Sequence, residues 1–268
     1  MRRWLLAGLL LCSLASSQAA ERIVSLAPFL TDTVVSLHAE DRLVGVVNDD
    51  YLPERLSHLA RIGGYRSLSL ERILAQKPDL VLGWTSGNDP QALRLLQSWG
   101  IRVVQFDPQD LQQVADTVLQ LGRELDTQAQ AEQLVETYQG ELRRLQRPLT
   151  ANAPRVFLQV WNDPMYTLSG TQMVSHALSH CGAVNVFQDL PGLAPQVSRE
   201  GVLAADPDMI VVLGDSNQQP GVWRDQWLKY PQLKAVANQQ VHVLDSTHLV
   251  RPTPDLVKGL AALCELMQ

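Results

Sequence analysis

Short apolar runs alternate with amphipathic stretches along most of this chain. Runs rich in Val, Ile, Leu and Phe predict buried strands at residues 22–26, 43–47, 80–84, 102–106, 155–160, 209–213 and 241–244. Apolar residues at helical spacing predict helices at residues 28–37, 90–99 and 255–267. Because helices separate the strands, the pattern indicates the α/β class, with mostly parallel sheets covered by helices.

The segment from Leu111 to Leu145 has a different pattern. It contains no proline and only two glycines, Gly122 and Gly140, and its apolar residues approximate helical spacing. We interpret Gly122 as the break between a first helix and a second helix over residues 127–146. A helix of about 20 residues is about 30 Å long, so the second helix could bridge two lobes. The alternative is an ordinary surface helix.

One pattern of fourteen residues occurs twice, 129 residues apart. The sequence SLERILAQKPDLVL at 69–82 and the sequence SREGVLAADPDMIV at 198–211 are identical at six positions. Each copy predicts a serine helix cap, a glutamate in the first turn, a short helix, a Pro-Asp turn and a strand. Repeat arrays have periods of about 20–50 residues, so this spacing favours two similar lobes. Glu71 and Glu200 either complement their helix dipoles or form a two-pronged surface for a partner.

The first twenty residues have the pattern of an export signal. Arg2 and Arg3 precede an apolar stretch, and small residues around Ala19-Ala20 suit cleavage. The apolar stretch is shorter than the roughly 20 residues of a membrane span. Cys12 is not preceded by the small residue that a lipid anchor needs, so soluble export is favoured. We therefore divide the chain into a signal peptide (1–20), an N-terminal lobe (21–124), a bridging helix (125–147) and a C-terminal lobe (148–268).

Charge and cysteine content restrict the partners and the compartment. The chain has 22 basic and 28 acidic side chains, and loss of the signal with its two arginines leaves 20 basic and 28 acidic. This excess of negative charge argues against nucleic acid and anionic membrane surfaces as direct partners. Cleavage also removes Cys12, which leaves Cys181 and Cys264 in an oxidising compartment. A disulfide is favoured there over two separately buried thiols.

The sequence carries no established catalytic motif. It has no phosphate-binding loop, no dinucleotide-binding glycine motif and no HExxH, and the segment from Gly214 to Gln218 lacks the last glycine of a nucleophile elbow. His176 and His180 are four residues apart and would share a helical face, as two zinc ligands can. Because no acidic third ligand is nearby, packed or solvated histidines are favoured. We expect neither a catalytic residue nor a bound metal.

Aromatic and polar side chains occur in the loops that follow the predicted strands. Ligands bind at the carboxyl ends of strands in open parallel sheets. A cleft lined by rigid aromatic side chains suits a bulky, partly apolar ligand, although each aromatic alone is equally typical of packing. The candidate ligand-binding residues are Pro28, Asp50, Tyr51, Tyr65, Trp84, Trp161, Tyr166, His248 and Arg251.

Together these features resemble the periplasmic substrate-binding proteins of ABC importers that have a helical backbone, a family that serves cobalamin, ferric siderophores and haem. The resemblance covers essentially the whole chain after the signal, and it is greatest to the cobalamin-binding members. It is carried by residues 69–81, 155–159 and 195–200, and by Cys181-Gly182 with Cys264 in the last helix. It implies two Rossmann-like lobes joined by one long helix, with the ligand cleft between them.

The resemblance also implies a transport function in the periplasm. A corrinoid, cobalamin above all, would be captured between the lobes and delivered to the permease and ATPase subunits of an importer in the inner membrane. Cobalamin would be the transported ligand and not a catalytic cofactor. Glu71 and Glu200 would dock onto the permease, Tyr65, Tyr166 and Arg251 would lie near the ligand, and Cys181 would pair with Cys264.

Several positions depart from the cobalamin-binding members. Ala194 stands in place of a cleft tryptophan and Thr247 in place of an aspartate, while Trp161 and His248 have no counterpart there. Haem or a ferric siderophore is therefore the alternative ligand within the family. The alternative outside the family is a secreted metal-dependent enzyme that uses His176 and His180.

Overall fold

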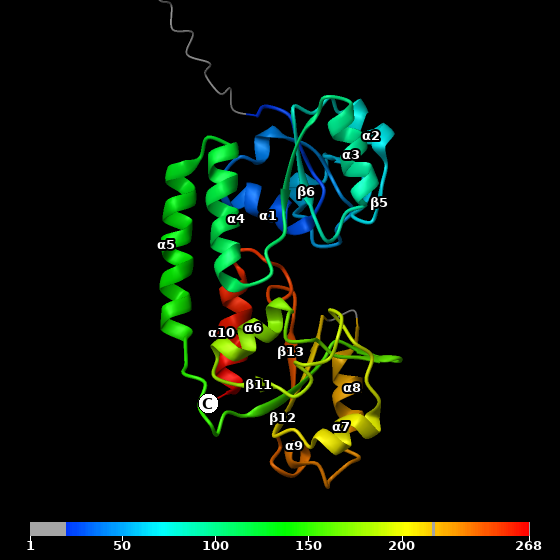
Figure 1. Cartoon of the computed structure of the whole chain (residues 1–268), viewed down its shortest axis with the longest axis vertical. Coiled ribbons are helices and arrows are strands. Elements are labelled where there is room, and N and C mark those ends of the chain that lie inside the picture. Colours follow the sequence, from blue (N-terminus) through cyan, green and yellow to red (C-terminus); the bar gives the residue numbers. More distant parts are fainter. Residues whose placement is uncertain (1–19, 216–217, 268) are drawn as a thin grey trace, which may run out of the picture.

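The computed structural model describes residues 20–215 and 218–267 and confirms the α/β class with two lobes. The predicted signal peptide with Cys12 lies outside the described residues, apart from Ala20. Figure 1 shows one lobe above the other, with helices α4 (Leu111–Glu124) and α5 (Gln128–Leu145) along one side of the molecule. Within the described ranges, no helix is long and apolar enough to cross a membrane.

The N-terminal lobe is built on a five-stranded parallel sheet in the order β3-β2-β1-β6-β7. Helices α1 and α4 cover one face of this sheet and helices α2 and α3 cover the other. Neighbouring residues of β1 accordingly belong to different apolar clusters, Ile23 to the first face and Val24 to the second. The bounds are β1 Ile23–Ser25, α1 Pro28–Ser36, β2 Leu43–Val46, β3 Ala60–Arg61, α2 Leu70–Ala75, β6 Leu80–Trp84, α3 Pro90–Ser98 and β7 Arg102–Phe106, with two short 3₁₀ turns (Glu40–Arg42, Glu54–Leu56) and a small antiparallel pair of β4 Gly63–Gly64 and β5 Ser67–Leu68.

The C-terminal lobe repeats this plan with a four-stranded parallel sheet in the order β11-β8-β12-β13. Helices α6 and α10 cover one face, and helices α7 and α8 pack with α9 on the other. A short hairpin of β9 and β10 follows β8 directly. The bounds are β8 Arg155–Gln159, β9 Trp161–Asn162, β10 Met165–Tyr166, α6 Met173–His180, β11 Val184–Asn185, α7 Arg199–Ala205, β12 Met209–Gly214, α8 Pro220–Trp227, α9 Lys234–Ala237, β13 Val241–Asp245 and α10 Leu256–Leu266.

The helices on one side of the molecule join the two lobes. Helix α5 packs along α4 of the N-terminal lobe and also against α10 of the C-terminal lobe. The buried hydroxyl of Tyr138 on α5 donates to the carbonyl of Leu111 at 2.9 Å, which fixes the two helices in register. A single apolar cluster contains residues of α1, α4, α5, α6 and α10, so the lobes share part of their core. We propose residues 125–147 as the connection between lobes on this basis.

Gly122 does not separate the two helices, contrary to the prediction from sequence. It lies inside α4, and the chain reverses at residues 125–127, where Asp126 has a φ of 54°. A Cβ added to Gly122 would lie 2.4 Å from the Cβ of Ala131 on α5. The glycine is therefore required for the close approach of α4 and α5 and not for the turn. Arg42 stabilises the turn by donating to the carbonyl of Leu125 at 2.6 Å.

The Pro-Asp turn of each repeat holds the first strand of its lobe. The carboxylate of Asp79 accepts the backbone N–H of Arg22 at 3.1 Å, and the N–H of Asp79 donates to the carbonyl of Arg22 at 3.0 Å. Asp208 makes the same pair of bonds with Arg155, at 3.0 and 2.8 Å. The repeat thus has a structural role, because its aspartates fix the register between β1 and β6 in one lobe and between β8 and β12 in the other.

Candidate functional site

The carboxyl ends of the two parallel sheets face each other. Tyr51, in the loop after β2, donates its hydroxyl to Asp215, in the loop after β12. Arg251, in the segment after β13, bonds to Asp49 in the loop after β2. Both contacts connect the ends of strands in different lobes. The space between the lobes is therefore bordered by the loops in which ligands of open parallel sheets bind.

Arg251 is the centre of an ion cluster that crosses between the lobes. Its guanidinium donates to both carboxylate oxygens of Asp49, at 2.6 and 3.0 Å, and to Asp32 on α1 at 2.8 Å. The side chains of Arg251 and Asp49 are only 17% and 6% exposed. Burial lowers the pKa of Arg251, but the bonds to Asp49 and Asp32 outweigh it and raise the pKa overall. Arg251 therefore remains a cation whose charge is matched by two carboxylates.

Asp32 is the carboxyl group of this cluster whose ionised form is disfavoured. Burial raises its pKa, against the opposing effect of the Arg251 charge, and the neighbouring Asp49 raises it further. Asp49 is held in place from its own loop, since its carboxylate also accepts the backbone N–H of Tyr51 at 3.1 Å. Two carboxylates thus share one guanidinium at the junction of the lobes.

Aromatic side chains gather at the end of β6, where we propose the cleft wall of the N-terminal lobe. The rings of Tyr65 and Trp84 lie 5.4 Å apart, and Phe29 contacts Trp84 edge-on at 5.8 Å. The indole N–H of Trp84 donates to Asp107 at 3.0 Å, which fixes the orientation of the ring. A Cβ on Gly87 would lie 1.9 Å from the Trp84 ring, so only glycine allows this packing. Tyr65 is 36% exposed and presents a rigid aromatic surface supported by Trp84.

We propose that the cleft wall of the C-terminal lobe consists of the β9–β10 hairpin and the loop after β13. Trp161 is 44% exposed and packs edge-on against Trp223 at 5.6 Å, while Tyr166 pairs with Trp161 across the hairpin. Tyr166 also forms an isolated bridge with Gln196, which ties the hairpin to the segment before α7. His248 is exposed in the loop after β13.

Two adjoining cavities lie between the lobes. The larger, of about 360 Å³, is bordered by α1, Tyr51 and the segment from Thr247 to Asp255. The smaller, of about 210 Å³, is bordered by the ends of β8, β12 and β13, with Tyr51 again on its edge. Tyr51, Thr247 and Arg251 line both cavities.

The structure brings only part of the predicted residue set together. Tyr51, His248 and Arg251 line the cavities, and Tyr65 and Trp84 contact each other on the N-terminal lobe. Pro28 is the first residue of α1 and Asp50 is exposed, with its neighbour Asp49 making the bond to Arg251 instead. Sequence reasoning missed Asp32, Asp49 and Asp215. Of these three residues, Asp32 could have been noticed from sequence, because it is the single charged residue in the helix PFLTDTVVS.

Glu71 and Glu200 lie at equivalent starts of α2 and α7. The serine caps are present in both copies, since Ser69 accepts from Arg72 N–H at 3.4 Å and Ser198 from Gly201 N–H at 3.0 Å. Bonds from its own backbone N–H and from the Ser198 hydroxyl lower the pKa of Glu200. Figure 1 shows α2 in one lobe and α7 in the other, both on the side of the molecule away from α5.

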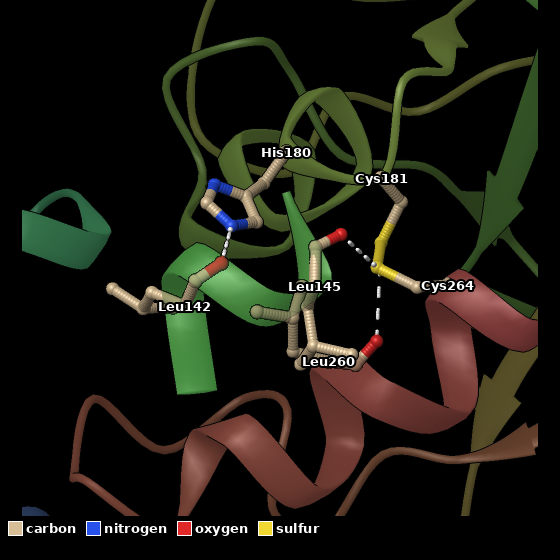
Figure 2. The surroundings of a disulfide bond; sticks show 6 residues. All are labelled: Leu142, Leu145, His180, Cys181, Leu260 and Cys264. Atoms are coloured by element: carbon tan, nitrogen blue, oxygen red, sulfur yellow. Dashed lines mark hydrogen bonds between the residues drawn. A yellow bond between two sulfur atoms is a disulfide. The ribbon is translucent and has the colours of Figure 1, made fainter. Parts of the chain in front are cut away.

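Cys181 and Cys264 form a disulfide, as predicted, and it ties α10 to the end of α6 (Figure 2). The Cys264 sulfur lies 3.8 Å from the carbonyl of Leu145, the last residue of α5. His180 bonds through Nε2 to the carbonyl of Leu142 at 2.8 Å, so its ring contacts the end of α5. Across residues 20–215 and 218–267, no group of three or more His, Cys, Asp or Glu side chains is placed to hold a metal ion.

One protein family matches this chain over most of its length. The family model described as "Periplasmic binding protein" matches residues 23–247. The vitamin B12-binding protein of Yersinia pestis (strain Pestoides F) is 34% identical over 264 residues, covering 97% of this chain and 92% of the relative. The crystal structure of the periplasmic vitamin B12-binding protein BtuF of Vibrio cholerae matches with a TM-score of 0.81 and 30% identity, covering 92% of this chain and 96% of that one.

Haem-binding proteins share the fold as well. The periplasmic haem-binding protein RhuT from Roseiflexus sp. RS-1 matches with a TM-score of 0.77 and 26% identity, over 93% of this chain and 98% of that one. Two lobes with facing strand ends, a shared helical layer and a family match over most of the length lead to one conclusion. This chain belongs to the periplasmic binding protein family.

Proposed function

We propose that this chain is an exported, non-catalytic protein that binds a corrinoid, cobalamin above all, between its two lobes in the periplasm. It delivers the ligand to the permease of an ABC importer in the inner membrane. The similarity to proteins named for vitamin B12 binding supports the ligand class. The chemistry of the cleft supports it independently.

The observation that carries the proposal is the charge state of the cleft. The two arginines that line the larger cavity both face carboxylates, since Arg251 bonds to Asp32 and Asp49, and Arg55 approaches Glu40 to 3.6 Å. Haem carries two propionates and many ferric siderophores are anionic, so both would need cations that are not already neutralised. A corrin ring carries neutral amide side chains, which can bond to carboxylates and hydroxyls without added positive charge.

The aromatic surfaces suit a large flat ring. We propose that Tyr65, supported by Trp84, contacts the ligand from the N-terminal lobe, and that Trp161 and Tyr166 contact it from the C-terminal lobe. Trp161 would supply the aromatic area that Ala194 does not. His248 lies at the edge of the larger cavity, where its ring can bond to polar groups of the ligand.

Titration of the purified protein with cobalamin and, separately, with haemin tests the ligand assignment. We expect cobalamin to co-elute at one equivalent and to give a saturable calorimetric signal. Tight haemin binding with a Soret band and no cobalamin binding would replace the corrinoid with haem. Failure of both ligands to bind would contradict the cleft chemistry that we propose.

Glu71 and Glu200 are the proposed contacts with the permease. Glu71→Arg with Glu200→Arg should preserve the ligand affinity of the purified protein, because both side chains are exposed at the starts of α2 and α7. Uptake through the cognate importer at limiting binding protein should fall by about tenfold or more, since like charges would then face each other. Glu132→Arg with Glu136→Arg on exposed positions of α5 makes the same change in net charge and should leave uptake intact. Equal uptake in both double variants would remove the docking role.

A further inference from the structure

Tyr51 lies in an unusual position for a residue of the cleft wall. It belongs to the N-terminal lobe, but its hydroxyl donates to the carboxylate of Asp215 in the C-terminal lobe. Its ring lies over the Arg251 guanidinium, 5.2 Å from centre to carbon. The side chain is 44% exposed, so burial does not hold it there. A single exposed tyrosine thus spans the space between the lobes.

This side chain also lies where the two cavities adjoin. Tyr51 lines both the cavity of about 360 Å³ and the cavity of about 210 Å³. The larger cavity extends toward α1 and the smaller toward the ends of β8 and β12. A ligand that contacts both lobes at this place has to enter the region between these cavities. It therefore meets the bond between Tyr51 and Asp215.

We propose that the hydrogen bond from Tyr51 to Asp215 is a latch between the lobes, which closes the ligand-free cleft and is broken when the ligand enters. The proposal rests on the proposed function in one respect, that a ligand binds between the lobes. It does not depend on which ligand this is. The Tyr51 hydroxyl then affects ligand affinity by stabilising the closed, ligand-free state and not by contacting the ligand.

The two connections between the lobes differ in a way that assigns them different roles. The bonds of Arg251 to Asp49 are buried and involve two full charges, so breaking them would leave the buried Asp49 carboxylate without a cation. The bond from Tyr51 is exposed and its donor is neutral, so water can replace either partner when the bond breaks. The Arg251 cluster is suited to persist as the point about which the lobes pivot, and the Tyr51 bond is suited to break.

A latch of this kind weakens the apparent affinity for a ligand. Only the fraction of molecules with a broken latch can accept the ligand, and the apparent dissociation constant rises as that fraction falls. A single exposed hydrogen bond to a carboxylate corresponds to a population ratio of about threefold to thirtyfold. Removal of the bond should therefore tighten binding, which is the opposite of what loss of a ligand contact does.

Tyr51→Phe removes the hydroxyl and keeps the ring over Arg251. Spin labels placed at Arg94→Cys and Lys229→Cys, two exposed positions on opposite lobes, report the distance between the lobes. Labelling is selective because both native cysteines of the described chain are in the disulfide. We expect Tyr51→Phe to broaden the distance distribution of the ligand-free protein toward longer values, and to lower the apparent dissociation constant for cobalamin by about threefold to thirtyfold. Tyr230→Phe removes a hydroxyl from a ring that packs beside Trp227 and lines neither cavity, and it should change neither quantity.

Each result decides the proposal. An unchanged distance distribution in Tyr51→Phe would overturn the latch, whatever the ligand is. Weaker cobalamin binding by Tyr51→Phe would also overturn it, because the hydroxyl would then be a direct ligand contact. If the wild-type protein does not bind cobalamin, the proposed function fails, and the distance measurement still tests the latch.

Discussion

The two lobes are alike in their scaffold and different in the walls that they present to each other. In both lobes the repeated pattern supplies a serine cap and an aspartate that fixes the first strand. The N-terminal lobe then presents an aromatic wall around Tyr65 and Trp84, whereas the C-terminal lobe presents a hairpin and the polar residues Asp215 and Arg251. The repeat therefore supplies the scaffold of each lobe, and the two lobes differ in the loops outside it, where we propose the ligand site.

The lobes also differ in how they are stabilised. The disulfide joins α6 and α10 of the C-terminal lobe, and no second disulfide is found among the described residues. The N-terminal lobe depends on its larger sheet and on packing against α4. Substitutions that affect one lobe, or the contact between the lobes, therefore test how each lobe is stabilised.

Removal of the disulfide should have the largest effect. The double variant Cys181→Ala with Cys264→Ala opens a loop of 83 residues, and the chain-entropy model gives a loss of about 4 kcal/mol in the free energy of unfolding. Denaturant titration measures the total loss, and hydrogen exchange should show that it falls mainly on α6 and α10. Equal loss of protection in both lobes would contradict a disulfide that acts on one. Unfolded, unreduced wild-type protein should contain no titratable thiol.

Arg251→Ala should have the next largest effect, because it removes the cation from the cluster between the lobes. Asp32 and Asp49 would remain as partly buried carboxylates without a cation, at a cost of about 3 kcal/mol near pH 7. Arg224→Ala removes a half-exposed arginine that pairs with its neighbour Asp225, and should change the free energy of unfolding by less than about 0.5 kcal/mol.

The loss in the free energy of unfolding of Arg251→Ala, its deficit, should depend on pH in a direction that follows from the pKa of Asp32. Burial already raises the pKa of Asp32 above its ordinary value in the wild type, and loss of Arg251 removes the effect that opposes this shift. A carboxyl group with a raised folded-state pKa favours the folded state at low pH and disfavours it as the pH rises. The deficit should therefore be largest near pH 7 and shrink as the pH falls toward 4. Denaturant titrations across this range would contradict the account if the deficit were constant.

The aspartates of the repeat provide the test of smallest expected effect. Asp79→Ala and Asp208→Ala should each lower the free energy of unfolding by about 1 kcal/mol, since each side chain accepts backbone N–H groups of a first strand. Asp79 should cost more, because it accepts from Glu21 and Arg22, whereas Asp208 accepts from Arg155 alone. Asp225→Ala serves as the exposed control. A loss confined to one lobe would show that the two copies are not equivalent.

Local patterns predicted the frame of this protein well. The aliphatic runs placed β7 and β13 within a residue of their observed ends, and the helix predicted from Pro90 is α3, which begins at that residue. The role of Gly122 was missed because its reason is contact with Ala131 on another helix. The two-residue strands of the β9–β10 hairpin are too short to leave a periodic signal.

The polar part of the site could not be predicted in the same way. Arg251 lies 219 and 202 positions away from Asp32 and Asp49, so no local pattern connects them. Asp50 was the predicted candidate in its loop, whereas its neighbour Asp49 bonds to Arg251. Sequence spacing does not determine which of two adjacent side chains turns inward. The aromatic candidates could be proposed from sequence because several large aromatic residues occur in loops after strands, although each alone is equally typical of packing.

The central claim is that both lobes hold one ligand between them, and calorimetric titration of cobalamin against single variants of each wall tests it most directly. Tyr65→Ala in the N-terminal lobe and Tyr166→Ala in the C-terminal lobe should each weaken binding by about tenfold to a hundredfold, as loss of a buried aromatic anchor does. Trp99→Ala, which removes an exposed aromatic at the end of α3, should leave the dissociation constant unchanged. If neither tyrosine matters, or if only one lobe contributes, the ligand does not lie between the two walls.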